Sequence, residues 1–185
     1  MWTICVHMRK NQQDKYGSEC VKFPISDRKL AEFIRRMGHE PDDFRFDVTD
    51  IVPTDLECIC GQSVDLNEIN DLAKRMCNTY GINIFAYYAM LEAYEPKTVA
   101  GAKNIWLNIG SYVLIGYGKS LTEMGRDYLK ACKGGVDPDD DPHMIGEKLM
   151  NEGKGIQTSY GYVFRKDCVI GSENPDRTDD GAIEE

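Results

Sequence analysis

The sequence lacks the features that would place the chain in a membrane or on a nucleic acid. It has no run of about 18 apolar residues, which excludes a transmembrane helix. Residues 1–8 hold neither a basic leader nor a long apolar run, so we expect no signal peptide and a cytoplasmic location. Cations are in deficit, because 22 Lys and Arg stand against 31 Asp and Glu. Neutralising phosphates needs a basic surface, so the net charge of −9 argues against nonspecific nucleic-acid binding.

Complete metal or disulfide motifs are also missing, although cysteine itself is not rare. The number of cysteines is odd and their spacings are scattered. The closest pair, Cys58 and Cys60, forms a CxC with no second pair nearby to complete a four-ligand zinc site. We therefore predict reduced thiols, and neither a metal nor a disulfide, for Cys5, Cys20, Cys58, Cys60, Cys77, Cys132 and Cys168.

No constellation of catalytic residues is recognisable. Gly-Lys-Ser at 118–120 suggests a phosphate loop, but Val113 occupies the position where the Walker pattern needs its first glycine, so a helix is the better interpretation. Asp139–Asp141 lack the spacing and the glycine of an EF-hand loop, which favours a solvated turn. The histidines lie far apart, at His7, His39 and His143. We predict no catalytic residues, no cofactor and no enzymatic activity.

Acidic side chains concentrate between Glu40 and Asp71. This stretch holds ten carboxylates and one cation, Arg45, so its net charge of −9 equals that of the whole chain. Apolar residues such as Phe46 and Ile51 interrupt the acids, and a disordered acidic tail would lack them. The pattern predicts folded structure with carboxylates on its outer side. Two interpretations stay open: a solvated face kept acidic for solubility, or a surface whose charge is its function.

Hydrophobic periodicity predicts an α+β fold in three parts. In residues 1–61 we expect strands at 2–8, 19–23 and 44–48, with a helix that Ser26 caps and Gly38 ends. Residues 62–104 are predicted to be helical, with helices from a capping box at Asp65 and Glu68 to about residue 78, over 84–93 and over 98–103.

The third predicted part, residues 105–170, is mixed. We expect a strand at 105–109, a helix over 111–132, a short helix at 144–150 and a hairpin of 155–158 with 161–166. Residues 171–185 are polar and acidic, and a frayed tail is expected there.

The order of four segments resembles that of the ArdA antirestriction proteins of conjugative transposons and plasmids. The similarity is one of pattern, extends over about residues 1–166, and lies in the order of the segments rather than in any single motif. The segments are Tyr16-Gly17 with Val21–Ile25, Phe46–Asp50, Asp65–Leu72, and Ile145–Leu149 with Gly161–Phe164.

This resemblance implies an elongated, three-part homodimer that imitates bent B-form DNA. Such a protein would occupy the DNA groove of type I restriction-modification enzymes, at their specificity and methyltransferase subunits, without itself binding nucleic acid. Carboxylates fixed on a scaffold would meet the enzyme's Lys and Arg in place of phosphates. The residues that would supply this charge are Asp42, Asp43, Asp47, Asp50, Asp55, Glu57, Asp65, Glu68 and Asp71, with Glu123, Asp127, Asp139, Asp140, Asp141 and Glu147 from the third part.

A function from a different class remains open. The chain would then be a non-enzymatic regulatory or scaffolding protein of a mobile genetic element. It would bind a protein partner through the apolar, tyrosine-rich residues Phe85, Tyr87, Tyr88 and Tyr94. Aromatic residues of this kind are also typical of a helix core. Salt dependence separates the two functions, because charge-led binding weakens with salt and apolar docking does not.

Overall fold

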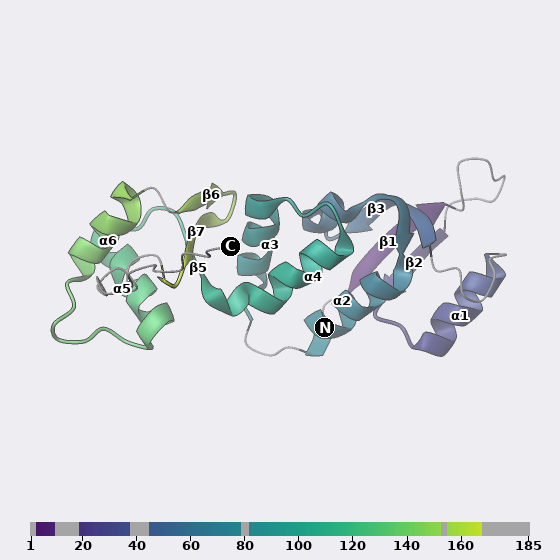
Figure 1. Cartoon of the computed structure of the whole chain (residues 1–185), viewed down its shortest axis with the longest axis horizontal. Helices are drawn as coiled ribbons and strands as arrows, with labels where there is room; N and C mark the ends of the chain where they lie inside the picture. The colour runs from purple at the N-terminus through teal and green to yellow at the C-terminus, as the bar shows by residue number, and fades with distance from the viewer. Residues whose placement is uncertain (1–2, 10–18, 38–44, 79–81, 153–154, 168–185) are drawn as a thin grey trace, which may run out of the picture. The chain divides into compact units, whose positions relative to one another are not determined.

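A computed structural model describes residues 3–9, 19–37, 45–78, 82–152 and 155–167. The chain folds into two compact units, residues 1–109 and 110–185. Each unit has its own antiparallel sheet and its own helices (Figure 1), so the predicted α+β class is confirmed. None of the helices in the described ranges combines the length and apolar character needed to cross a bilayer.

The first unit is built on a four-stranded sheet in the order β2-β1-β3-β4. Its strands are β1 (Ile4–Arg9), β2 (Glu19–Phe23), β3 (Arg45–Val52) and β4 (Gly61–Asp65). Val6 on β1 is paired with Val21 on one side and with Ile51 on the other. Because side chains alternate along a strand, apolar residues fall on one face and become buried, while Cys5 and His7 point to the opposite face.

Helices cover the apolar face of this sheet. The helix α1 (Asp27–Arg36) begins at Ser26, whose Oγ accepts the Lys29 N–H at 3.4 Å, and its Phe33 ring lies 6.1 Å from that of Phe46 on β3. The helix α2 (Leu66–Asn78) buries the polar side chain of Asn70, which is paired with the backbone N–H and C=O of Ile25 at 2.9 and 3.0 Å. This pairing satisfies a buried amide and fixes α2 against the chain that leads into α1.

The remaining elements of the first unit pack together beside the sheet. They are the 3-10 turn η1 (Thr54–Ile59), α3 (Ile84–Tyr94) and α4 (Val99–Asn108), which is followed by η2 (Ile109–Ser111). Tyr87 of α3 is fully buried, meets Trp106 of α4 edge to face at 4.9 Å, and donates its hydroxyl to the Ala102 carbonyl at 3.1 Å. The two helices are therefore joined by apolar and polar contacts at once.

The second unit contains a three-stranded sheet in the order β5-β7-β6 and two helices. Its elements are β5 (Tyr112–Ile115), α5 (Leu121–Lys133), α6 (Pro142–Asn151), β6 (Ile156–Thr158) and β7 (Gly161–Arg165). The core gathers Val113, Ile115, Met124, Tyr128, Leu149 and Phe164. The buried Tyr128 donates its hydroxyl to the carbonyls of Arg165 and Lys166, 3.0 and 2.6 Å away, which ties α5 to the end of β7.

Most of the predicted elements are confirmed, but two predictions around residue 110 are wrong. Residues 105–109, predicted as a strand, belong to the end of α4 and to η2, because Val99, Ala102 and Trp106 are buried at helical spacing. The predicted helix over 111–132 begins only at Leu121. Residues 112–115 form β5, and 116–120 form a loop rather than a helix.

The sheet also extends further than predicted. The strand β4 was not expected, and it pairs with β3 through Phe46 and Val64. The expected boundary near residue 61 coincides with the start of this strand, and the three-part division stays a prediction. The expected roles of Gly38, Phe44 and the tail after residue 170 fall outside the described residues.

The contact between α5 and α6 requires glycine at two places. A Cβ on Gly125 would overlap the Pro142 carbonyl, and a Cβ on Gly146 would overlap the Leu121 carbonyl. We expect Gly146→Ala to lower the free energy of unfolding of the second unit by about 1–3 kcal/mol, because the backbone it meets cannot rotate away. Urea unfolding followed by far-UV circular dichroism measures this. The matched control is Gly116→Ala, whose Cβ would have no atom within 4 Å. Equal stability of the two variants would contradict this packing.

Candidate functional site

The predicted acidic residues are distributed over many elements of both units. In the first unit they lie on β3, on η1, at the end of β4 and on α2: Asp47, Asp50, Asp55, Glu57, Asp65, Glu68 and Asp71. In the second unit they lie on α5, in the loop that follows it and on α6: Glu123, Asp127, Asp139, Asp140, Asp141 and Glu147. Asp42 and Asp43 lie outside the described residues.

Several of these carboxylates are engaged in local backbone structure. Asp47 accepts the Ser63 N–H at 3.1 Å, where Ser63 has a positive φ of 56° within β4. Asp65 accepts the Asn67 N–H at 2.8 Å and so caps α2, as its position predicted. These two acids hold the β3–β4–α2 connection in shape, and each has one carboxylate oxygen directed at the protein's own backbone.

Two acids of the second unit cap its helices. Asp141 accepts the N–H groups of His143 and Met144 at 2.9 and 3.2 Å at the start of α6. Glu123 and Ser120 form a reciprocal capping box at the start of α5. Hydrogen bonds from the Ser120 backbone and hydroxyl lower the pKa of Glu123. Both carboxylates therefore serve helix initiation.

Cations of the same unit neutralise a third group of acids. Asp71 on α2 lies 2.5 Å from the Lys103 ammonium on α4 and 3.1 Å from Arg75 Nε. In the second unit, Asp127 is paired with Lys119. These carboxylates are therefore less able to present a phosphate-like charge to a partner.

The second unit holds two further pairs. Asp140 lies 2.8 Å from the Lys133 ammonium. The hydrogen bond from Lys133 lowers the pKa of Asp140, and a second one from the Asp137 N–H lowers it less. Glu147 lies 3.5 Å from His143 Nε2, an ion pair when that imidazole is protonated. The expected solvated turn at 139–141 is thus held by internal contacts at Asp140 and Asp141.

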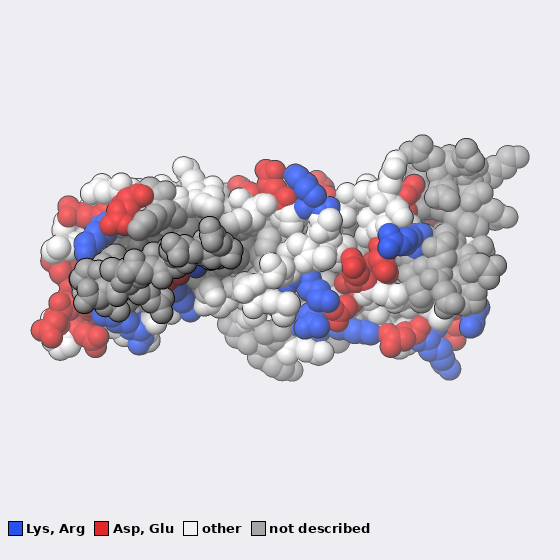
Figure 2. Space-filling view, viewed as in Figure 1, with Lys and Arg blue, Asp and Glu red and all other residues white. Residues whose placement is uncertain are grey.

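Charges of both signs are interspersed on the surface. On the face shown in Figure 2, the described residues carry red and blue side chains side by side over both units. Among the predicted acids, Asp50, Glu57, Glu68 and Asp139 are exposed and form no ion pair with a cation of the described ranges. These four are the carboxylates best placed to meet cations of another molecule.

Acidic side chains gather most clearly along a shallow groove of about 430 Å³ between η1 and α3. Its walls carry Asp55 and Glu57 from η1, Glu92 from α3 and Glu95 just after α3, with Lys97 as the one cation among the described residues that line it. Lys97 lies 3.2 Å from Glu95. We call this the η1–α3 groove. An Arg or Lys side chain from a partner would meet carboxylates from both walls there, which makes the groove a candidate binding site for positive charge.

The floor of the η1–α3 groove is apolar and aromatic. Tyr88 and Leu91 of α3 are buried there, beside Cys58 of η1. Burial, and then the charge of Asp55, raise the pKa of Tyr88 to about 12, so its hydroxyl stays neutral. An apolar floor lowers the local dielectric and strengthens attraction between the wall carboxylates and a bound cation.

A second cleft in the first unit, of about 270 Å³, has mixed charge. Asp65 and Glu68 face it together with Arg45 and Lys97. Equal numbers of acids and cations give little selectivity for a charged partner. The η1–α3 groove is therefore the stronger candidate.

Sequence reasoning missed two of the four acids of the groove. Glu92 and Glu95 lie outside the acidic stretch, and only the packing of α3 beside η1 brings them to Asp55 and Glu57. Glu92 lies on the helix predicted over 84–93, but Glu95 lies beyond the end of that helix, so helical periodicity alone could not place the two acids together. Nothing in the local sequence indicated that both would face η1.

Comparison with protein-family models finds no match for this chain. No curated protein and no solved structure matches it either. The resemblance to the ArdA proteins therefore stays a prediction drawn from the order of its segments.

The aromatic residues of the alternative interpretation do not form one surface. Tyr87 and Tyr88 are buried in the first unit. Phe85 and Tyr94 are 56% and 44% exposed, but nine positions apart on α3 they project from opposite sides of the helix. This arrangement gives less support to an aromatic docking surface than the groove gives to a charged one.

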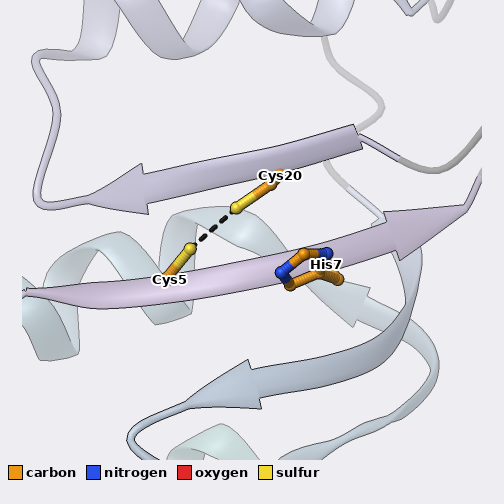
Figure 3. A group of neighbouring side chains, drawn as sticks. All are labelled: Cys5, His7 and Cys20. Atoms are coloured by element: carbon orange, nitrogen blue, oxygen red, sulfur yellow. Dashed lines mark hydrogen bonds between the residues drawn. The ribbon is translucent and has the colours of Figure 1, made fainter.

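Thiols and an imidazole converge where the sequence predicted no cluster. Cys5 Sγ lies 2.7 Å from Cys20 Sγ, and His7 stands beside them on β1 (Figure 3). Burial, followed by the hydrogen bond with Cys20, raises the pKa of Cys5 to about 11. Both cysteines are reduced in this structure, as are Cys58, Cys60, Cys77 and Cys132. Cys168 lies outside the described residues.

Replacing Asp71 by Asn should reduce the acid sensitivity of the fold. The Lys103 and Arg75 side chains, Lys103 first, hold the pKa of Asp71 below its ordinary 3.8. The ion pairs therefore stabilise the folded state above about pH 4, and this stability is lost as the pH falls through the lowered pKa. Because Asp71 is 39% exposed, its contribution stays below roughly 1 kcal/mol.

Urea unfolding at about pH 7 and about pH 3 measures this effect. Asp71→Asn should narrow the difference in unfolding free energy between the two pH values. Glu68→Gln is the control, since Glu68 lies on the same helix without an ion pair to a described cation and should leave the difference unchanged. An unaltered difference in Asp71→Asn would remove the ion pairs from the acid response.

Proposed function

We propose that this protein is an inhibitor of type I restriction-modification enzymes that acts by imitating B-form DNA. It would work in the cytoplasm as a homodimer, without catalysis and without a cofactor. Two observations support the proposal: the ordered segments that resemble ArdA proteins, and the η1–α3 groove, whose walls place four carboxylates around one lysine. The groove is the observation that carries it.

The physical basis is charge complementarity. Duplex DNA presents about one negative charge per 1.7 Å of its axis, and enzymes that hold it arrange Lys and Arg to match. Carboxylates on a folded scaffold meet the same cations and release the counterions that both surfaces had gathered. Such an interface forms quickly and weakens with salt, because its attraction is mostly electrostatic.

The contacts within the protein divide the predicted acids into two groups. Asp71, Asp127 and Asp140 are paired with lysines, and Asp141 and Glu123 cap helices, so these support the scaffold. Asp50, Glu57, Glu68 and Asp139 are exposed on β3, on η1, on α2 and in the loop after α5. In this proposal the second group, joined by Asp55 and Glu92 of the η1–α3 groove, makes the contacts with the enzyme.

Competition with DNA tests the proposal. The protein is titrated into a type I methyltransferase bound to labelled duplex DNA, at about 50 and about 200 mM salt. We expect stoichiometric displacement of the DNA that weakens at the higher salt. Failure to displace DNA from several such enzymes would overturn the proposal.

Charge neutralisation locates the surface. The triple variant Asp55→Asn, Glu57→Gln, Glu92→Gln should weaken displacement at least about tenfold, because three contacts between carboxylates and cations of the enzyme are lost. The control variant Glu19→Gln, Asp27→Asn, Glu32→Gln removes the same charge from acids paired with Arg36, Lys74 and Arg28. It should retain most of the inhibition. Equal losses in the two variants would assign the effect to net charge and not to the groove.

A further inference from the structure

A group of three metal-binding side chains lies on the outer face of the first unit's sheet. Cys5 and His7 are two residues apart on β1, so they project from the same face. The antiparallel register sets Cys20 of β2 directly opposite His7. Figure 3 shows Cys20 reaching from β2 toward Cys5, with the His7 ring beside them. Two adjacent strands therefore bring together two thiols and an imidazole that are up to 15 positions apart in the chain.

The distances suit one ion. One ligand atom from each of the three residues lies within 4.8 Å of the others. Three atoms no further apart than this can all lie within about 2.8 Å of a single point, close to the Zn–S and Zn–N bond lengths of about 2.3 and 2.0–2.1 Å. Small rotations of the side chains would complete the geometry, including a widening of the 2.7 Å between the two sulfur atoms.

The ligand set points to a particular class of metal. Thiolate sulfur is a soft ligand and imidazole is a borderline one, a combination that suits Zn²⁺ and disfavours Mg²⁺ or Ca²⁺. Other groups face the same side of the sheet. Asp50 of β3 stands opposite His7, and its negative charge favours a bound cation, whereas Lys22 of β2 stands opposite Cys5 and opposes it.

We propose that Cys5, His7 and Cys20 form a binding site for Zn²⁺ or a similar thiophilic divalent cation. The two thiols release their protons on binding, the three residues supply three ligands, and water completes a tetrahedral site. The ion would tie β2, an edge strand of the sheet, to its inner neighbour β1. The site is separate from the η1–α3 groove in its residues and does not depend on the proposed inhibition of restriction enzymes.

The test uses the full chain, stripped of metal and kept reduced with a phosphine. Titration with Co²⁺ should give one equivalent of bound ion, with the visible absorption of a tetrahedral site and a sulfur-to-cobalt charge-transfer band. Addition of Zn²⁺ should abolish both. The double variant Cys5→Ser, Cys20→Ser should weaken binding roughly 100-fold or more, and His7→Asn, which keeps both thiols, should lose the imidazole contribution and bind measurably less tightly.

The other pair of nearby cysteines in the sequence, Cys58 and Cys60, provides the control. Cys58→Ser, Cys60→Ser also removes two thiols, from the CxC that is the other close cysteine pair, and should leave cobalt binding unchanged. Zn²⁺ should raise the unfolding temperature of the wild-type chain and of this control, but not that of Cys5→Ser, Cys20→Ser. If the latter fails to fold, His7→Asn alone decides the question.

Three results would overturn the proposal. The first is an absence of cobalt binding at stoichiometric concentration. The second is binding that survives in Cys5→Ser, Cys20→Ser or disappears in the Cys58, Cys60 control. The third concerns air oxidation of Cys5 and Cys20 to a disulfide, followed by mass spectrometry as the loss of two hydrogen atoms. Thiolates bound to Zn²⁺ would be protected, so oxidation at the same rate with and without one equivalent of Zn²⁺ would contradict the site.

Discussion

The antiparallel pairing of β1 with β2 and β3 is the constraint on which the first unit depends. Alternate side chains along β1 lie on opposite faces of the sheet: Ile4 and Val6 point toward the helices and are buried, whereas Cys5 and His7 point away. The same register that builds the core also places Cys20 against His7. A slip of one residue would exchange the two faces, so the core and the proposed metal site are specified together.

Charge has several uses in this protein, and its local surroundings decide which applies. A carboxylate at the start of a helix, such as Asp65 or Asp141, satisfies backbone N–H groups that would otherwise lack partners. One that faces a lysine, such as Asp71, links two helices. In the η1–α3 groove four acids stand with one cation, so negative charge is in excess there.

Much of the fold could be predicted because its signals are local. The helix after Ser26, the helix after Asp65 and the last hairpin each combine a cap or turn with the appropriate periodicity, and all three are confirmed. The strand prediction for residues 105–109 is wrong. Ile and Trp favour strands, but Trp106 lies in a helix, where it packs against Tyr87. Gly61–Asp65 gave no strand signal, since its pairing with β3 supplies the structure.

The sequence by itself determined the fold class, the bounds of the three helices α1, α2 and α3, and the surplus of negative charge, because each follows from neighbouring residues or from composition. The tertiary structure decided which acids are neutralised, which face the η1–α3 groove, and that Cys5, His7 and Cys20 meet. Those outcomes depend on strand register and helix packing between distant segments. The residues next to a carboxylate or a thiol in the sequence do not indicate which distant residue will contact it in the folded protein.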